Sequence, residues 1–436
     1  MRSSTFKVIL GSLNNKIEYA LLHGWQGLPE HLPSDLDIAL APKDLAHLKQ
    51  VLLSVKDAKL VNLLQHETTC YYFVLALQNG TRVRFLPVDV ALDYRRDGRI
   101  WFGAEELLKG RRRWKEFWVA APEVEFKYLL VKKILKQHVP PRAFERLQAL
   151  AQELGALADD EARRLLGEKW AGRVMAWIRA GNREALEQEI RRLKRQLLWQ
   201  KFKQEPLNPL KYWLPEIKRI WRRWRHPTGL WVAVLGPDGA GKSTLIQGLQ
   251  KELAGAFRRT AAFHLMPRPF RKRGDGGPVT DPHGRPPRSL PISLLKLVYY
   301  WLDYTLGYWL KIRPALVCST LVLFDRYYDD LLIDPKRYRY GGPMRLARLL
   351  RRFIPRPDVF LVLDVPVEEL LRRKQEVPRE ELERQVAAYR RFALGTPNAY
   401  LLDGSRPPDE VVHQVLDMIL DFLHERYLKR QTFSGG

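Results

Sequence analysis

Hydrophobic and polar positions divide the chain into three kinds of pattern. Between residues 6 and 137, short apolar runs such as Tyr71–Leu77 and Arg82–Val90 alternate with helical periodicity at Lys43–Val55, which predicts a small α/β unit. Residues 142–200 have the periodicity of successive amphipathic helices and contain few helix breakers. After Gly229 the pattern changes to strand, glycine-rich loop and helix, followed by two more apolar strands.

A different composition separates the second pattern from the third. Residues 205–228 contain four prolines, and between Lys194 and Arg225 ten Lys or Arg accompany only two acids, interleaved with Trp199, Trp213, Trp221 and Trp224. One interpretation is an interdomain linker whose tryptophans pack on both neighbours. The other is peripheral attachment to an anionic inner membrane leaflet, since basic and aromatic residues together are typical of membrane-surface segments.

Charge and cysteine content indicate what kind of partner the protein has and in which compartment it works. The chain has 436 residues, with 74 Lys and Arg against 49 Asp and Glu, a net charge of +25. This charge indicates an anionic partner, but the usual nucleic-acid signatures are absent, so no sequence-specific nucleic-acid partner is expected. Two cysteines exclude a disulfide framework and favour the cytoplasm. The apolar stretch 291–310 is interrupted by Lys296 and Asp303, and we interpret it as a buried helix rather than a membrane span.

The clearest motif follows the apolar run Leu230–Leu235. Gly236-Pro-Asp238-Gly239-Ala240-Gly241-Lys242-Ser243-Thr244 is a complete phosphate-binding loop in its strand, turn and helix setting. Glycines let backbone N–H groups surround phosphates, and the following helix adds its favourable dipole. Lys242 is expected to reach the β and γ phosphates, and the Ser243 hydroxyl is expected to bind Mg²⁺. The sequence therefore predicts a site for a nucleoside triphosphate.

Two further apolar strands carry candidate chemistry. Leu321–Phe324 ends in Asp325-Arg326, and an acid at the end of a strand beside the loop is where a carboxylate holds Mg²⁺ through water. Phe360–Asp364 is followed by a segment containing Arg372, Arg373 and Arg379. This segment is interpreted either as a lid that closes on the transferred phosphoryl group or as a solvated helix with ion pairs.

Residues 229–428 resemble thymidylate kinase and its nucleoside monophosphate kinase relatives. The resemblance rests on the loop, on Asp325-Arg326-Tyr327, on Leu363-Asp-Val-Pro with Arg372-Arg373-Lys374, and on Tyr400–Val411. It implies phosphoryl transfer from ATP with Mg²⁺ to an acceptor phosphate gripped by Arg326, with the catalytic arginine supplied by the lid. Ser405 would lie near the adenine. The resemblance also suggests homodimers through a helix such as Leu294–Leu310.

The region that normally holds the acceptor departs from the family pattern. Instead of a Glu-Pro-Gly loop, the chain has a basic insertion, with Arg268, Arg271, Lys272, Arg273, Arg285 and Arg288. The acceptor is therefore either a nucleoside monophosphate such as dTMP or a larger phosphorylated molecule such as a phosphosugar or glycan. A third alternative is a non-catalytic NTP-binding scaffold at a membrane or nucleic acid.

Acidic residues in the first pattern suggest a second site. Asp35 and Asp37 form an Asp-x-Asp pair on a strand, and Asp89 lies on another, which fits a two-metal cradle. Residues 5–137 resemble the nucleotidyltransferase fold of DNA polymerase beta, with Gly24-Trp25 in place of the family's Gly-Ser. The domain is therefore either an active nucleotidyltransferase or a degenerate binding or scaffold domain. We expect an α/β protein with a nucleotidyltransferase-like domain (1–138), a helical extension (139–204), a linker (205–228) and a parallel-sheet, three-layer P-loop kinase domain (229–430).

Overall fold

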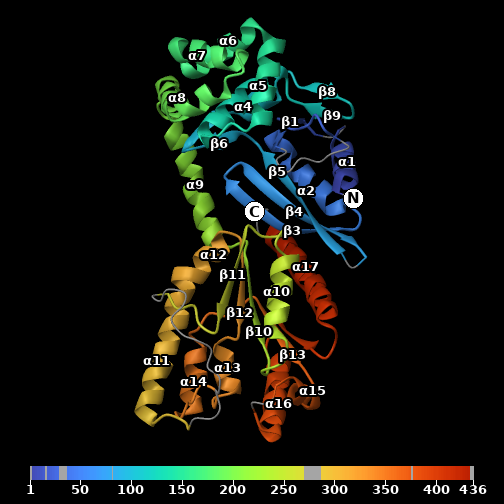
Figure 1. Cartoon of the computed structure of the whole chain (residues 1–436), viewed down its shortest axis with the longest axis vertical. Coiled ribbons are helices and arrows are strands. Elements are labelled where there is room, and N and C mark those ends of the chain that lie inside the picture. Colours follow the sequence, from blue (N-terminus) through green and yellow to red (C-terminus); the bar gives the residue numbers. More distant parts are fainter. Residues whose placement is uncertain are drawn as a thin grey trace. The chain divides into compact units, whose positions relative to one another are not determined.

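The chain forms two compact units, Met1–Trp221 and Arg222–Gly436. The computed structural model describes residues 2–14, 17–28, 37–80, 82–269, 286–374 and 377–432. Figure 1 follows the chain through both units. Each unit has its own sheet, and each is described by itself below.

A mixed seven-stranded sheet is the centre of the first unit, with strand order β3-β4-β5-β2-β1-β9-β8. Its strands are β1 (Tyr19–Leu21), β2 (Asp37–Leu40), β3 (Ala58–Glu67), β4 (Cys70–Asn79), β5 (Arg82–Ala91), β8 (Arg112–Trp114) and β9 (Phe117–Val119). A separate hairpin pairs β6 (Tyr94–Arg96) with β7 (Arg99–Phe102). Strand β2 runs parallel to β5 and antiparallel to β1. The predicted strands at 71–77 and 82–90 are confirmed as parts of β4 and β5.

The helices of the first unit precede its strands, lie between them and follow them in sequence. They are α1 (Arg2–Leu13), η1 (Pro42–Asp44), α2 (Leu45–Ser54), α3 (Ala104–Leu108), α4 (Pro122–Lys136), α5 (Pro141–Leu154), α6 (Ala156–Leu166), α7 (Glu168–Arg179) and α8 (Arg183–Gln204). Apolar residues of α4–α8 form one continuous core that also includes Leu22 and Ala39 from the sheet side. The predicted run of amphipathic helices is therefore confirmed, and its apolar faces pack on one another.

The segment interpreted as a linker contains a helix. Helix α9 (Asn208–Arg225) passes through Pro215 without ending. Asn208 exchanges hydrogen bonds with the backbone of Ile100, and the Glu216 carboxylate accepts bonds from the backbone and side chain of Thr68. Contacts with residues more than a hundred positions away thus fix the part of this helix up to Trp221 on the first unit.

The second unit is built on a parallel five-stranded sheet with strand order β11-β12-β10-β13-β14. Its strands are β10 (Leu230–Leu235), β11 (Arg259–His264), β12 (Thr320–Asp325), β13 (Val359–Asp364) and β14 (Ala399–Asp403). Strand β10, the first in sequence, lies at the centre, so the chain order reverses beside it. In parallel sheets this reversal opens a crevice at the carboxyl ends of the strands, which is where ligands bind.

Helices cover both faces of this parallel sheet (Figure 1). They are α10 (Lys242–Glu252), α11 (Leu290–Gly307), the π-helical turn η2 (Tyr308–Ile312), α12 (Arg313–Val317), α13 (Tyr328–Ile333), α14 (Met344–Arg351), α15 (Val367–Arg373), α16 (Arg379–Gly395) and α17 (Pro408–Thr432). Alternate residues of β10, including Trp231 and Ala233, join α11–α14 and α16 in one core. Helix α10 packs against α17. The expected three-layer arrangement with a parallel sheet is present.

Helix α11 differs from its prediction in one respect. The stretch 291–310 is helical as expected, but only one side is buried, through Ser293, Leu297, Asp303 and Tyr304. Its other side exposes large apolar residues, among them Leu295 (72%) and Leu302 (41%). Within the described residues, no helix combines the length and apolar composition needed to cross a bilayer.

Candidate active site

The phosphate-binding loop connects the centre of the parallel sheet to α10. Gly239 and Gly241 have φ angles of 82° and 92°, in a region that side chains with a Cβ rarely adopt. These glycines let the loop turn back on itself before Lys242 begins the helix. Ser243 and Thr244 follow in the first turn of α10 and are exposed. The predicted cofactor-binding residues Gly236–Thr244 therefore occupy a single loop and helix start.

Lys242 folds back over this loop. Its Nζ donates hydrogen bonds to the carbonyl oxygens of Gly236 (3.0 Å) and Pro237 (2.6 Å), and the side chain is 7% exposed. Burial, with the Arg326 guanidinium nearby, lowers the pKa of Lys242 to about 7. An arriving phosphate would favour the charged form of Lys242. The amino group of Lys242 therefore lies inside the loop, in position to contact a polyphosphate.

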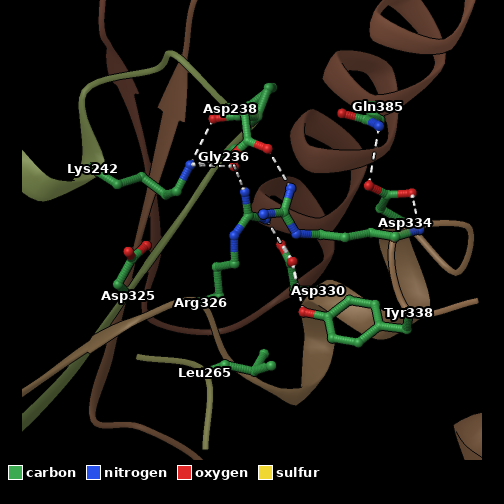
Figure 2. Close-up of polar contacts among 12 residues, drawn as sticks. Gly236, Asp238, Lys242, Leu265, Asp325, Arg326, Asp330, Asp334, Tyr338 and Gln385 are labelled. Atoms are coloured by element: carbon green, nitrogen blue, oxygen red, sulfur yellow. Dashed lines mark hydrogen bonds and ion pairs between the residues drawn. The ribbon is translucent and has the colours of Figure 1, made fainter. Parts of the chain in front are cut away.

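Asp325 ends β12 beside the loop (Figure 2). Its Oδ2 lies 3.1 Å from Nδ1 of His264, which ends the neighbouring strand β11. Its Oδ1 is buried and has no hydrogen-bond partner. Burial would raise the pKa of Asp325, but His264 and Lys242 outweigh it and lower the pKa. An ionised carboxylate with one unsatisfied oxygen is suited to a cation or its bound water.

Arg326 is the centre of a buried ion-pair cluster. It is 3% exposed, and its guanidinium donates to Oδ2 of Asp330 (2.6 Å) and to Oδ1 of Asp238 (2.5 Å). Figure 2 shows Arg326 between these two carboxylates, and Lys242 Nζ lies 3.8 Å from the same Oδ1 of Asp238 that Arg326 binds. Asp238 belongs to the phosphate-binding loop, so this cluster ties the residue after β12 directly to the loop.

Four residues that the sequence did not single out complete the cluster. Asp330 accepts hydrogen bonds from the hydroxyls of Tyr338 (2.9 Å) and Tyr389. Arg337 donates to Oδ2 of Asp238, so two guanidinium groups converge on one carboxylate. Burial would raise the pKa of Asp238, but Arg326 and the other nearby cations hold it well below its usual range. Asp330 is only four positions after Arg326, but Arg326 precedes α13 and has a φ of 70°, so helical spacing does not predict their contact.

The three arginines of the expected lid have different environments. Arg373 reaches the loop, where it donates to the carbonyl oxygens of Gly239 and Gly404, both at 3.3 Å. Arg379 is exposed and pairs with Glu368 and Glu383. Arg372 is exposed on α15. The structure therefore brings one of the three predicted lid arginines to the phosphate-binding loop.

A cavity of about 390 Å³ opens beside the loop. Gly239, Gly241 and Thr244 line one side, and Gly404, Arg406 and Val411 line another. Ser405 belongs to the same turn after β14 and donates a hydrogen bond to Asp403 (2.5 Å). This volume falls within the range of cavities that hold small molecules and cofactors.

The basic insertion is described only at its two ends. Arg271, Lys272, Arg273 and Arg285 lie outside the described residues. The backbone N–H of Arg268 donates to Asp303 (3.0 Å), and the Arg288 guanidinium donates to the carbonyl oxygen of Tyr338 (2.7 Å). Tyr338 also bonds to Asp330. The C-terminal end of the insertion is thus connected to the Arg326 cluster through Tyr338.

The predicted metal set of the first unit is only partly present among the described residues. Asp37 and Asp89 are paired across β2 and β5, but Asp35 lies outside the described residues. The Asp37 carboxylate binds Lys132 and accepts a hydrogen bond from Tyr128 (2.7 Å), and His23 Nε2 lies 2.7 Å from it. In the described ranges no three His, Cys, Asp or Glu side chains form a group that could hold a metal ion. The ammonium group of Lys132 is paired with Asp37, at the place where the predicted two-metal site would have a metal ion.

A phosphate-binding loop at the central strand of a parallel sheet, with Asp325 ending the adjacent strand and Arg326 following it, defines a nucleotide-binding protein of the P-loop class. No protein-family model matches the chain. It is 30% identical to a thymidylate kinase of Xanthomonas euvesicatoria pv. vesicatoria over 216 residues, which are 46% of this chain and 87% of the relative. It is also 30% identical to a thymidylate kinase of Pseudomonas fluorescens, over 98% of that protein and 46% of this one. The chain belongs to the thymidylate kinase family, and this relationship supports a nucleotide kinase.

Proposed function

We propose that the second unit transfers the γ-phosphoryl group of ATP to a nucleoside monophosphate such as dTMP. The observation that carries this proposal is the contact between the phosphate-binding loop and the Arg326 cluster, made by Asp238. A donor phosphate held by the loop would lie next to an acceptor phosphate held by Arg326. The thymidylate kinase relatives support this choice of acceptor.

Groups of the loop would bind and orient the donor. Backbone N–H groups of Gly239–Gly241 and the start of α10 would surround the phosphates, and Lys242 would exchange its two carbonyl partners for phosphate oxygens. The cavity between the loop and the turn at Gly404 would hold the adenosine. Arg373, already at the loop, would place its guanidinium on the transferred group.

The residues present fit a magnesium ion. Ser243 lies exposed at the start of α10, and Asp325 offers a buried carboxylate oxygen without a partner. These two side chains would hold Mg²⁺, directly or through water. When bound, the ion would neutralise charge on the β and γ phosphates.

The test is acceptor-dependent release of ADP by the purified full-length chain. ATP and Mg²⁺ are supplied with dTMP, dUMP, other monophosphates or a panel of phosphosugars. Lys242→Ala is expected to lower turnover by at least about a thousandfold. Lys251→Ala, at an exposed lysine on the same helix, is the matched control and is expected to retain activity. Unchanged turnover in Lys242→Ala would contradict the proposal.

A larger phosphorylated acceptor, such as a phosphosugar or glycan, is the second candidate. It is favoured by Arg288 at the end of the basic insertion, which is joined to the Arg326 cluster through Tyr338. Turnover of a phosphosugar with silence towards dTMP would select this candidate. ATP binding without any acceptor-dependent ADP would instead favour the non-catalytic scaffold.

A further inference from the structure

Helix α9 is amphipathic, but its polar side is the side that faces the protein. Asn208, Tyr212 and Glu216 are each less than 8% exposed. Asn208 bonds to Ile100, the Tyr212 hydroxyl donates to Glu67 (3.0 Å), and Glu216 bonds to Thr68. Helices of soluble proteins usually bury their apolar side and expose their polar side. The orientation of α9 is the reverse.

The outward side of α9 is a continuous row of large apolar residues. Leu214, Ile217 and Trp221 are each at least 60% exposed. With helical geometry the row occupies an arc of about 120° and runs for about 21 Å along the helix. Its members are Leu210, Trp213, Leu214, Ile217, Ile220, Trp221 and Trp224, which we call the α9 apolar face.

Basic residues flank one side of this face. Lys211, Lys218, Arg222 and Arg225 are exposed and occupy the neighbouring arc of about 60°. Two acids lie in the stretch from Lys194 to Arg225, and one of them, Glu216, is on the buried side of α9. The surface therefore combines apolar side chains, three of them tryptophans, with an adjacent row of positive charge.

We propose that the α9 apolar face binds the surface of a bilayer that contains anionic lipid. Tryptophan, leucine and isoleucine would enter the boundary between headgroups and acyl chains, while the adjacent lysines and arginines would contact anionic headgroups. The net charge of +25 strengthens attraction to such a surface over long range. The hydrogen bonds on the polar side of α9 hold the helix so that this face stays outward.

Vesicle flotation of the full-length chain tests the proposal. Vesicles contain phosphatidylcholine alone or with about a third phosphatidylglycerol, at low salt, where screening is weak. Flotation is expected with the anionic vesicles and not with phosphatidylcholine alone. Failure to float with anionic vesicles, or equal flotation with both, would overturn the proposal.

Two pairs of variants separate the apolar and charged contributions. Leu214→Gln with Ile217→Gln is expected to weaken vesicle binding by roughly tenfold or more. Leu157→Gln with Leu394→Gln, at exposed positions on α6 and α16, is its matched control. Lys211→Gln with Lys218→Gln is also expected to weaken vesicle binding by about tenfold or more. Its control is Lys136→Gln with Lys169→Gln, which removes the same charge at exposed positions outside α9. All four substitutions on α9 are exposed, so thermal unfolding is expected to stay unchanged.

The outcomes also distinguish a protein partner from a membrane. If Leu214→Gln with Ile217→Gln dissociates an oligomer and the unaltered chain does not float, the face is a contact between copies and the proposal is wrong. If the control variants weaken flotation as much as the α9 variants, general charge or hydrophobicity explains binding and the proposal is also wrong. The Lys242→Ala chain is expected to float normally, because this binding is independent of kinase activity.

Discussion

At the scale of residues, Asp238 has an unusual position in the phosphate-binding loop. Its two carboxylate oxygens are bound by different arginines, Arg326 and Arg337, from the segment that follows β12. Breaking a buried ion pair by removing one partner typically costs about 3–5 kcal/mol, because the other charge is left uncompensated. Asp238 and Arg326 are therefore expected to be needed for stability as well as for activity.

Arg337 offers a cleaner test of acceptor binding because it is partly exposed. We expect Arg337→Gln to raise the acceptor KM by about 10-fold to 100-fold, because one charge-assisted hydrogen bond to the acceptor is lost. The affinity for ATP is expected to stay unchanged. Steady-state kinetics and equilibrium ATP binding measure the two effects. Arg345→Gln, at an exposed arginine on α14, is the control. An equal fall in ATP affinity would show that Arg337 serves the donor site instead.

Asp325 is expected to act through its unpartnered oxygen. Asp325→Asn keeps the size of the side chain but removes the charge, so kcat is expected to fall about 100-fold to 1,000-fold and the half-saturating Mg²⁺ concentration to rise. Kinetics over a range of Mg²⁺ concentrations measure both effects. His264→Asn removes only the partner of the other oxygen and should have a much smaller effect. If the two variants are equally impaired, the Asp325–His264 contact matters more than the free oxygen.

At the scale of elements, α16 is joined to the turn after α13 by an ion pair. Glu381 on α16 is 9% exposed, pairs with Lys336 (2.8 Å) and accepts from Arg384. Burial would raise its pKa, but these two cations outweigh burial and lower the pKa to about 2. Because the folded pKa lies below the ordinary 4.5, the stabilisation is complete above about pH 4.5 and is lost as the pH falls towards 2.

We therefore expect Glu381→Gln to lower the free energy of unfolding by about 1–3 kcal/mol at pH 7. The difference from the unaltered protein should shrink as the pH falls below 4.5, because protonated Glu381 loses the same charge. Denaturant unfolding at a series of pH values provides the measurement. The exposed Glu383→Gln on the same helix is the control, with an expected change near zero. A pH-independent difference would mean that packing, not charge, explains the effect.

Local patterns predicted the strands of the parallel sheet but not helix α9. Strands β10, β12 and β13 are continuous apolar runs, as expected for strands buried on both faces, so their positions followed from the sequence. The prolines of α9 suggested a linker, whereas bonds to Ile100 and Thr68 hold it as a helix. Arg337 was missed for the same reason, since its partner Asp238 is 99 residues away.

At the scale of the whole molecule, the exposed side of α11 predicts association between copies of the chain. Contiguous exposed apolar patches are rare on monomers and usually mark contacts with other molecules. We expect an apparent mass of twice 51.0 kDa in light scattering. Leu295→Lys should shift it to 51.0 kDa, because a buried lysine without a partner is costly. Leu394→Lys, at an exposed leucine on α16, should not. A monomer at all concentrations would contradict this prediction.

The pairing of Asp238 with Arg326 and Arg337 has a consequence for selectivity among anions. The Asp238 carboxylate competes with other anions for both guanidinium groups. Because it belongs to the same chain, its effective concentration beside them is high. Chloride or inorganic phosphate would have to displace the Asp238 carboxylate from the two arginines. Such a small anion makes no other contacts that could offset the loss of these ion pairs. A complete substrate brings the contacts of its remaining atoms and can displace the carboxylate. If these arginines hold the acceptor phosphate as proposed, Asp238 would thereby protect the site from small anions before substrate binds.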